Sequence, residues 1–558
     1  MSTKRTYHIG GAAVPRVVSK SEGEESVLVS KTNPTSLFDP NVEDDKAVIN
    51  AAIDYAISKG IYEVIVEGEY TSTTPIIAKS NIHLNVLPNS ILKNCLKFGD
   101  VIHNDEDEPI TDFKLTATID VNNTYRGTGL KLYNFNDVEL NVRVYNVTNG
   151  NGWGVFLGVK DADTSDFICK NIKGSIEVDG HDGTLESVLI FNTHHANLDI
   201  VCKNKTNGPT IGLWQKVEHS NIKAYMNNCA TVGLYYSYSC NNLWLDVTGE
   251  DCYSLVSGAN QSDHGNFGYD RCRNINIKVS GTGIGAAAPS AVAVTIGSID
   301  GGKVEIGSLT NFGIALNINE GKSSATKFFT RNVDFYLGGI HENNPTSIHH
   351  RIHSGILISN AIEKANLNFY GGTLQGDENQ RYPVTFSQGI ADGVNFYGTQ
   401  LIPYSNNQEH IYLEAGTVLG AVKVTGHHGE ITFGQEHFFV DSYREGFGLP
   451  HRYMAVGGLW LDTITNTKKI KKGLEYPYFL NEDLPFTSII TLNDNGDVST
   501  KLYTEIGLTI YYIYDSKEGY LVDKTDEIDG EGNAIGNLLH FHYDENGNII
   551  SKGYAIKI

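Results

Sequence analysis

Carboxylate side chains on two long segments of the chain could together cleave a glycosidic bond. Asp263 and Asp270 lie on the first segment, and Glu342 lies on the second. Hydrolysis of a glycosidic bond commonly requires two carboxyl groups, one acting as an acid and the other as a base or nucleophile. We therefore predict that Asp263, Asp270 and Glu342 are catalytic, without assigning which is the acid and which is the base. Any one of them could instead be an ordinary solvated carboxylate, because an acidic chain has many of these.

Aromatic rings and arginines occur close to these carboxylates. Rings cover the faces of sugars, and arginine binds carboxylates or hydroxyls through several N–H groups. We predict that the following residues contact a sugar substrate: Tyr269, Arg271, Asp377, Glu378, Arg381 and Tyr382. Further rings occur at Trp214, Tyr235, Tyr236, Tyr238 and Trp244. About half of these should fill the core, and any that face outward would form a platform for a polysaccharide.

Histidine and cysteine side chains at regular spacing raise the question of a metal site. His195, His219, Cys240 and Cys272 each lie two positions before the start of a repeated pattern. Equivalent positions on stacked coils are about 4.8 Å apart in a line, whereas zinc ligands lie ~2.0–2.3 Å from one ion. We therefore predict a stacked ladder of half-buried side chains and expect no metal or other cofactor. Cys240 and Cys272 could be close enough for a disulfide, but the odd total of seven cysteines indicates mostly reduced thiols.

An internal repeat must position these residues. A polar residue, usually Asn or Asp, precedes an alternating apolar stretch about every 28 residues. The repeat starts are Asn81, Asp112, Asp137, Asp166, Asn197, Asn221, Asn242, Asn274, Lys303, Asn332, Asn366 and Gly393. Because apolar residues alternate with a period of two, the repeated unit contains strands, and its length fits one coil of a parallel β-helix. The near-constant spacing favours this fold over a many-stranded sandwich or barrel.

Different elements are expected at the two ends of the array. A capping helix over residues 45–59 would follow Asp44 and end at Gly60, within a β-helix domain of residues 41–445 whose coils run from about residue 80 to 440. Residues 1–40 form a polar leader, and residues 446–473 form a neck or hairpin. Residues 474–558 contain strands around turn signals and predict a C-terminal β-sandwich-like domain. The sequence thus predicts an all-β protein.

The segment around the expected cap resembles a known family. Asp44 and Asp45, Ala51–Ile53, Gly60, Val64–Tyr70 and Ser80–Ile82 look like the opening of the right-handed β-helix of the pectate-lyase superfamily, as found in phage tailspikes. Two departures are Glu67, where the family usually has proline, and a single glycine at Gly60. The resemblance implies a homotrimer, a sugar-polymer ligand, and a leader that attaches to the tail proteins of a virion.

Charge and targeting signals exclude several other classes. The formal net charge of −22 repels phosphate backbones, so we expect no nucleic-acid partner. Residues 1–18 include Lys4, Arg5 and Arg16 but no apolar core, so they are not a signal peptide. No apolar run is long enough to span a bilayer, and we expect no membrane insertion. Synthesis in the host cytoplasm, followed by residence in the virion, fits these features.

Three functions therefore remain open at the level of sequence. The leading hypothesis is a phage tailspike or receptor-binding protein that binds a bacterial surface polysaccharide and depolymerises it by glycosidic hydrolysis. The second is a tail adhesin without catalysis. The third is a cellular polysaccharide lyase or hydrolase, which the missing signal peptide disfavours.

Overall fold

The computed structural model describes most of the chain, with gaps. The described residues are 16–21, 24–30, 46–72, 74–94, 99–122, 127–147, 152–159, 167–258, 271–284, 291–297, 299–319, 330–338, 356–359, 365–376, 382–386, 389–391, 393–406, 408–413, 417–419, 421–425, 427, 430–433, 438–441, 453–456, 459–462, 467–470, 487–504, 508–515, 519–536, 538–543 and 548–555. The chain divides into two compact units, residues 1–302 with 321–328 and residues 303–320 with 329–558. Each unit is described by itself.

A single helix opens the first unit. Helix α1 (Lys46–Lys59) buries Ile49, Ala52, Ile53 and Ala56, which recur at helical spacing, and it ends at Gly60 with a φ of 66°. The predicted capping helix is therefore confirmed. Strand β2 (Glu24–Ser30) pairs in parallel with β3 (Glu63–Glu67) and antiparallel with β1 (Arg16–Ser21), so part of the expected leader extends the sheet of the first coils.

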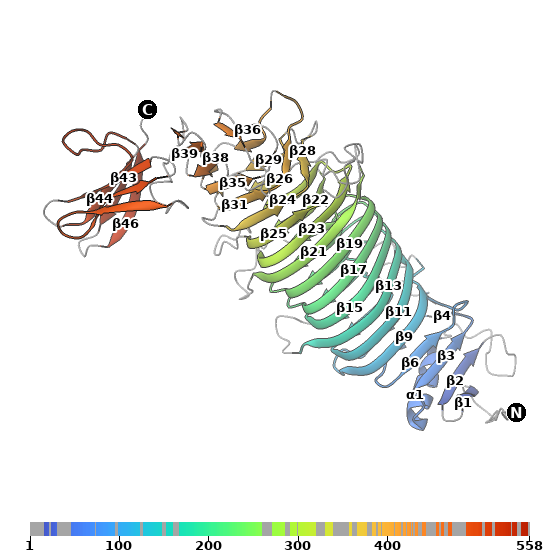
Figure 1. Cartoon of the computed structure of the whole chain (residues 1–558). Coiled ribbons are helices and arrows are strands. Elements are labelled where there is room, and N and C mark those ends of the chain that lie inside the picture. The colour runs from blue at the N-terminus through green and yellow to red at the C-terminus, as the bar shows by residue number, and fades with distance from the viewer. Residues whose placement is uncertain are drawn as a thin grey trace. The chain divides into compact units, whose positions relative to one another are not determined.

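The body of the first unit is a ladder of parallel strands (Figure 1). Its long strands, each hydrogen-bonded to the next, are β9 (Ile110–Asp120), β11 (Phe135–Val147), β13 (Cys169–His181), β15 (Thr193–Lys205), β17 (Glu218–Cys229), β19 (Asn241–Cys252) and β21 (Cys272–Gly283). The short strands of the opposite sheet are β5 (Ile76–Ile77), β8 (Ile102–His103), β10 (Leu130–Tyr133), β12 (Val155–Gly158), β14 (Val188–Phe191), β16 (Ile211–Trp214), β18 (Leu234–Ser237), β20 (Val256–Gly258) and β22 (Val292–Gly297).

The first coils contain shorter strands of the same kind. These are β4 (Glu69–Ser72), β6 (His83–Val86) and β7 (Ile91–Asn94), and β23 (Ile299–Thr310) contains the boundary between the two units. One long and one short strand alternate along the chain, and each pairs with its equivalent in the next coil. This is a right-handed parallel β-helix, the hand that parallel crossovers adopt almost without exception. The predicted fold class is confirmed.

Strict alternation builds the core. In β11, Val138, Leu140, Val142 and Val144 are buried, while the residues between them face outward. Because equivalent strands pair in register, each inward position stacks on the same position of the next coil. The core is therefore a set of columns that no coil could bury alone.

A column of residues with left-handed backbone conformation turns the chain at the same place in successive coils. Its members in the first unit are Asn81, Asp112, Asp137, Asn171, His195, His219, Asn242, Asn274 and Gly301, with φ between 51° and 81°. Asn and Asp tolerate this conformation better than other side chains with a Cβ. Their amides also bond along the column, as Asn274 Nδ2 donates to Asn242 Oδ1 at 2.9 Å.

Three predicted repeat starts were wrong in register. Asn197 and Asn221 lie two residues after the turn, which His195 and His219 make, and Lys303 likewise follows Gly301 by two. The start placed at Asp166 lies outside the described residues, and Asn171 occupies its column. The errors at Asn197 and Asn221 have a physical reason. Composition does not distinguish an outward-facing Asn two positions after the corner from an Asn at the corner itself.

The second unit repeats the coil pattern with shorter strands. One parallel ladder contains β25 (Arg331–Leu337), β27 (Leu367–Tyr370), β31 (Val394–Tyr397) and β35 (Ala421–Thr425), and the other contains β24 (Ile314–Asn319), β26 (Ile356–Ser359), β29 (Val384–Phe386), β33 (Ile411–Leu413) and β36 (Glu430–Phe433). Two smaller parallel pairs are β28 (Thr373–Gln375) with β32 (Gln400–Ile402), and β30 (Gly389–Ala391) with β34 (Thr417–Leu419). Phe335, Phe369 and Phe396 stack inside with ring centroids 4.6 and 4.8 Å apart.

Antiparallel pairing replaces the coils towards the C-terminus. β37 (Phe438–Asp441) pairs with β36, and β38 (Tyr453–Val456), β39 (Leu459–Asp462) and β40 (Thr467–Ile470) form hairpins. The last six strands form one antiparallel sheet: β41 (Ser488–Leu492), β42 (Val498–Tyr503), β43 (Leu508–Tyr514), β44 (Leu521–Thr525), β45 (Leu538–Tyr543) and β46 (Ile549–Ala555). The C-terminal region is thus all-β as predicted, but its described strands form a single sheet rather than the two layers of a sandwich. Within the described residues, no helix is long and apolar enough to cross a membrane.

The corner column gives a stability test at Asn274. Replacing Asn274 by Ala removes the bond that it donates to Asn242 and the bond that it accepts from Asn276, and it places an unsuited side chain in the left-handed region. The free energy of unfolding should therefore fall by about 1–2 kcal/mol beyond the effect of the lost bonds. Asn274→Gly keeps the backbone conformation accessible and should be less harmful. The matched control is Asn141→Ala, which loses one exposed bond from Ser175 Oγ at an extended position. Equal urea midpoints for all three variants would contradict the role of the corner.

Candidate functional site

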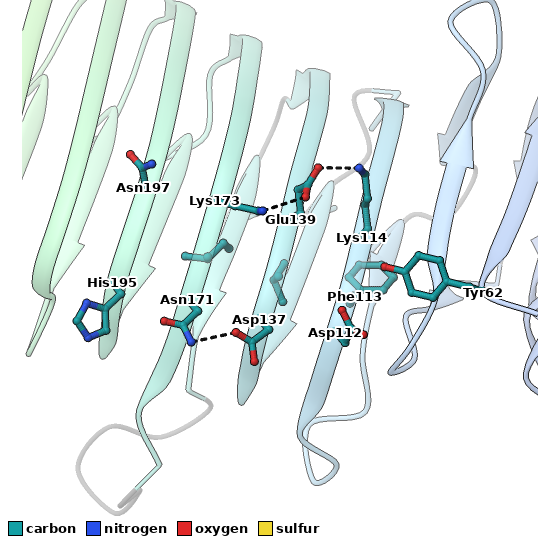
Figure 2. A pocket seen from close by; sticks show the side chains of 12 residues that line it. Tyr62, Asp112, Phe113, Lys114, Asp137, Glu139, Asn171, Lys173, His195 and Asn197 are labelled. Carbon is teal, nitrogen blue, oxygen red and sulfur yellow. Dashed lines mark hydrogen bonds and ion pairs between the residues drawn. The ribbon is translucent and has the colours of Figure 1, made fainter. Parts of the chain in front are cut away.

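A shallow groove runs along the outer face of the long strands (Figure 2). One wall is the corner column from Asp112 to His195, and the other is the row of outward residues two positions later. That second row begins with Lys114, Glu139, Lys173 and Asn197. Together with Tyr62 at one end, these residues enclose a volume of about 430 Å³. The hollow itself ends at His195 and Asn197, and the same two rows continue beyond it along the outer face. We call the hollow together with these continuing rows the polar groove.

An ion-pair network fills the N-terminal end of the polar groove. Lys114 Nζ lies 2.7 Å from Glu139 Oε1, and Lys173 Nζ lies 3.3 Å from Glu139 Oε2 (Figure 2). The hydrogen bond from Lys114, supported by Lys173, holds the pKa of Glu139 below its ordinary value. Glu139 is therefore ionised at neutral pH and is unsuited to act as a general acid. Surface pairs of this kind add little stability, so their main effect is on the charge of the groove.

The corner wall combines carboxylates, amides and imidazoles. Asn171 Nδ2 donates to Asp137 Oδ1 at 2.9 Å, and the rings of His195 and His219 stack 5.5 Å apart at 21°. Two of the four members of the predicted ladder, His195 and His219, therefore stack, but both are exposed rather than half-buried. Cys240 and Cys272 do not belong to this ladder, because they lie two positions before the corner, where both are buried and neither forms a disulfide. The four residues were predicted to share one column because Asn197 and Asn221 were taken as corners. The corners are His195 and His219, so the cysteines lie two positions away from the column of the histidines. Within the described residues, no cluster of three or more candidate ligands could hold a metal ion.

The inner row of the polar groove continues towards β21. Asn197, Asn221, Trp244 and Asn276 occupy the same position in successive coils. Trp244 is 61% exposed, and both of its neighbours in the row are asparagines rather than rings. At about 4.8 Å per coil, the row from Lys114 to Asn276 extends roughly 29 Å. The inner row therefore extends well beyond the hollow, which ends at Asn197.

The exposed tryptophan differs from the other outward rings. Tyr336, Tyr370 and Tyr397 of the second unit stack on one another 5.1 and 5.2 Å apart, so their ring faces contact their own chain. In the part of the chain that the structure describes, no ring stacks on Trp244. A bare indole face set among amides is what the apolar face of a sugar ring packs against.

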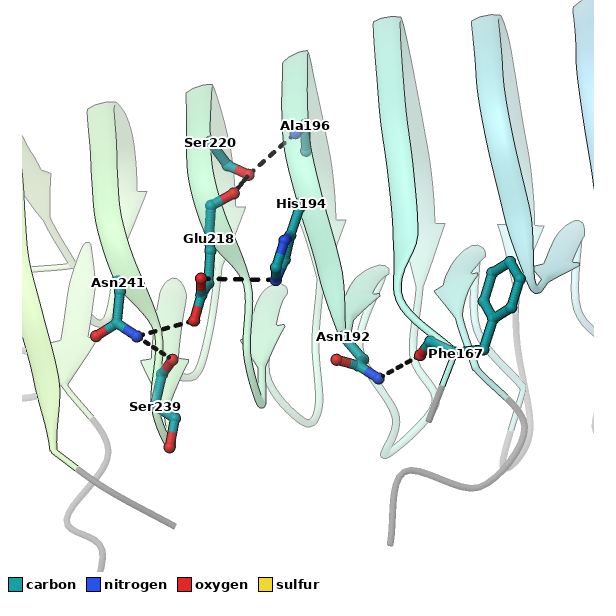
Figure 3. Close-up of polar contacts among 8 residues, drawn as sticks. All are labelled: Phe167, Asn192, His194, Ala196, Glu218, Ser220, Ser239 and Asn241. Carbon is teal, nitrogen blue, oxygen red and sulfur yellow. Dashed lines mark hydrogen bonds and ion pairs between the residues drawn. The ribbon is translucent and has the colours of Figure 1, made fainter. Parts of the chain in front are cut away.

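A second polar network lies on the other side of the corner wall (Figure 3). His194 Nε2 lies 3.6 Å from Glu218 Oε2, and Asn241 Nδ2 donates to Glu218 Oε1 at 2.9 Å. Burial lowers the pKa of His194, and the nearby Glu218 only partly offsets this effect. Ser220 Oγ donates to the Glu218 carbonyl and accepts the Ala196 N–H. These bonds tie three coils together directly behind the groove.

The opposite sheet carries an aromatic cluster on its outer side. Tyr133, Phe156 and Leu189 are at most 9% exposed, and Trp153, Phe191 and Trp214 pack against them. Glu186 accepts hydrogen bonds from Trp153 Nε1 at 3.0 Å and from Tyr235 Oη at 2.5 Å. The polar atoms of these rings are thus already used, and the cluster is a packed satellite core rather than an open platform.

The predicted outward platform is correspondingly reduced to one ring. Tyr236 is buried in the coil core, Tyr238 is 8% exposed, and Trp214 and Tyr235 belong to the aromatic cluster. Only Trp244 of this set is exposed. Some of these rings were predicted to form an exposed platform, and among them Trp244 alone is exposed.

Buried polar side chains hold the loop that carries Glu186. Lys205 Nζ donates to the carbonyls of Gly183 at 2.5 Å and Leu185 at 2.8 Å, and His181 Nδ1 shares a hydrogen bond with Ser187 Oγ. Both side chains lie inside the coil, in a column with Val147, Cys229 and Cys252. Burial lowers the pKa of Lys205 to about 8, and burial together with the charge of Lys205 lowers the pKa of His181 to about 3.

Most of the site residues predicted from sequence lie outside the described residues. These are Asp263, Asp270, Glu342, Tyr269, Asp377, Glu378 and Arg381. Arg271 lies 3.9 Å from Asp300 Oδ2, and Tyr382 stacks on Tyr412 at 4.2 Å and 6°. Neither residue lines the polar groove described above.

The sequence prediction missed the polar groove, although a signal was present. Polar or charged residues recur two positions after the corner, as in Lys114, Glu139 and Lys173. Each of these is an ordinary surface residue by itself. Only the correct register places them in one row, and that register was misassigned in the coils of His195 and His219.

Comparison with solved structures finds several similar chains. The protein is similar to the N-terminal fragment of gene product 12 of bacteriophage phi29, at 13% identity and a TM-score of 0.36 over 70% of each chain. It is also similar to a tailspike protein of E. coli bacteriophage HK620 in complex with a pentasaccharide, at 11% identity and a TM-score of 0.37 over 73% of this chain and 75% of that one. A third is the A-module of the mannuronan C-5 epimerase AlgE4 of Azotobacter vinelandii, at 15% identity and a TM-score of 0.27 over 68% of this chain and 94% of that one. No protein-family model and no curated protein sequence matches the chain.

Buried His181 should make the fold sensitive to acid. Its pKa is about 3 in the folded chain and ordinarily 6.5, so the unfolded chain binds the extra proton between these values. The free energy of unfolding should therefore fall as the pH falls from about 6.5 to about 3. His181→Gln should weaken that dependence in thermal melts recorded across this range, while the exposed control His219→Asn should leave it unchanged. An identical pH profile for His181→Gln and the wild type would contradict the assignment.

Proposed function

We propose that this protein is a tailspike-like receptor-binding protein that binds a bacterial surface polysaccharide along the polar groove. The observation that carries the proposal is Trp244, whose exposed indole lies in line with Asn197, Asn221 and Asn276. Indole faces pack on the apolar faces of sugars, and amides donate and accept hydrogen bonds with hydroxyls. One exposed ring flanked by amides along the row can contact successive sugars of a polymer.

The shape of the polar groove supports a polymer rather than a small molecule. The groove is shallow and follows the coil axis, whereas pockets for small ligands are enclosed and bury most of the ligand surface. Coil spacing of about 4.8 Å is close to the length of one pyranose ring, so consecutive coils can contact consecutive sugars. The strands beneath are fixed by pairing on both sides, so little conformational freedom is lost on binding.

A place in a virion tail, as a homotrimer, belongs to the same proposal. Support comes from the resemblance of residues 44–82 to the β-helix of phage tailspikes. Apolar side chains on the edge strand β41 add to it, since Ile489, Ile490 and Leu492 are each more than half exposed. An exposed apolar edge strand invites pairing with another copy of the chain.

The binding proposal is tested by Trp244→Ala. Loss of the indole should weaken binding of the host polysaccharide roughly tenfold to a hundredfold, because a central aromatic anchor carries a large share of such an interface. Trp244→Phe should retain part of the affinity. Tyr404→Ala is the matched control, since it removes a ring that is 56% exposed outside the groove. Unchanged affinity in Trp244→Ala, measured by calorimetry on the intact protein, would refute the proposal.

Hydrolysis of the bound polymer remains a prediction from sequence. We expect the purified protein to shorten its polysaccharide, as measured by size-exclusion chromatography, and we expect Asp263→Ala, Asp270→Ala or Glu342→Ala to lower that rate at least a hundredfold. Full activity in all three variants would reject these residues as catalytic. If the wild type binds the polymer without shortening it, the protein is a non-catalytic adhesin. The polar groove favours this second candidate, because its described residues account for binding alone.

A further inference from the structure

We propose that the polar groove takes an uncharged stretch of glycan, made of sugars that bear hydroxyl and amide groups rather than carboxylates or phosphates. This inference rests on the proposed function and specifies the class of ligand. It follows from the distribution of charge around Trp244 and along the walls of the polar groove.

The segment of the groove around Trp244 carries no net charge. Its inner row contains Asn197, Asn221 and Asn276 beside the indole, and its corner wall contains His195, His219, Asn242 and Asn274, with the histidines counted as neutral. The next outward row along the same strands is Asp199, Lys223, Asp246 and Lys278. Because its two carboxylates alternate with two ammonium groups in neighbouring coils, their fields cancel at the distance of a ligand.

The N-terminal end of the polar groove is no better suited to an anion. Lys114 and Lys173 both lie against Glu139, and their positive charges are already shared with that carboxylate. Asp112 and Asp137 stand on the facing wall. Two lysines against three carboxylates leave one negative charge, so an acidic sugar would be repelled rather than held.

Arginine, the side chain best suited to carboxylate and phosphate, is missing from the described lining of the groove. Arg143 lies farther along its strand and faces Glu177, with Nε 3.6 Å from Oε2. Lys170 and Arg273 precede the corner column, so they lie beyond that wall. The formal charge of −22 opposes the approach of a polyanion at long range.

The functional groups that are present match neutral sugars. The asparagine amides already bond one another in part, since Asn221 Nδ2 donates to Asn197 Oδ1 at 3.3 Å and Asn276 Nδ2 donates to Asn274 Oδ1 at 3.3 Å. Each amide has two N–H donors and a carbonyl with two lone pairs, so donor and acceptor capacity remains for hydroxyl or acetamido groups. The indole covers an apolar sugar face. Binding that depends on such contacts changes little with salt, whereas neutralisation of a polyanion weakens steeply as salt is added.

The experiment uses the full-length protein and a panel of purified bacterial surface polysaccharides with neutral, uronate-containing or phosphate-containing repeating units. Each uronate polymer is also tested after chemical reduction of its carboxyl groups to alcohols. We expect the tightest ligand to be neutral, with an affinity that changes less than about threefold between roughly 0.05 and 0.5 M NaCl. Trp244→Ala should weaken that binding at least tenfold.

A charge-placing variant sharpens the test. Asn221→Asp removes two donors, including the one that bonds Asn197 Oδ1 at 3.3 Å, and adds a negative charge in the inner row. It should weaken the neutral ligand by roughly threefold to tenfold. Asn141→Asp adds the same charge on the same face but outside the groove lining, keeps its bond from Ser175 Oγ, and should bind like the wild type.

Two results would overturn the inference in distinguishable ways. If the tightest ligand is acidic, loses affinity on carboxyl reduction and with salt, and still requires Trp244, then the charge argument is wrong while the proposed function stands. If no polymer in the panel binds, or if binding is the same in Trp244→Ala, then the proposed function fails and this inference fails with it.

Discussion

The structure depends on one backbone constraint, a residue in the left-handed conformation at the same point of successive coils. A coil that turned elsewhere would shift its strand by a residue and move its apolar side chains from the core to the solvent. Asn, Asp and, in two coils, His make this turn in the first unit, and a glycine makes it at Gly301. Register follows from the turn, and the inward columns and outward rows follow from register.

The same constraint explains how much of the fold could be predicted from the sequence. The coil period, the capping helix and the turns at Asn81, Asp112, Asp137, Asn242 and Asn274 are visible because Asn and Asp are both common and favoured at such corners. His195 and His219 are rare in that role, and an asparagine two positions later offers a plausible false start. Composition cannot separate these two registers, but inter-strand pairing does. The catalytic residues predicted from long loops fall outside the described part of the chain and stay predictions. Loop composition indicates chemistry but does not fix the position of a side chain.

Neighbouring outward rows of this fold differ in whether their side chains contact one another or stay exposed. Like residues that stack on one another serve the chain itself, as in the tyrosine ladder of the second unit and the histidine pair at the corner. On the opposite sheet, Glu186 likewise accepts hydrogen bonds from Trp153 and Tyr235, so the polar atoms of these rings bond within the chain. Trp244 breaks this pattern, since its row neighbours are amides and its indole is exposed. A large ring that its own fold leaves uncovered is the strongest indication of an external partner that the described residues offer.

The decisive experiment is a structure of the protein with an oligosaccharide of a bacterial surface polysaccharide. We expect a sugar ring packed on the indole of Trp244, with the following sugars running along the coil axis between the corner column and the row of Asn197, Asn221 and Asn276. A saccharide seated on another face, with the indole of Trp244 left bare, would contradict it.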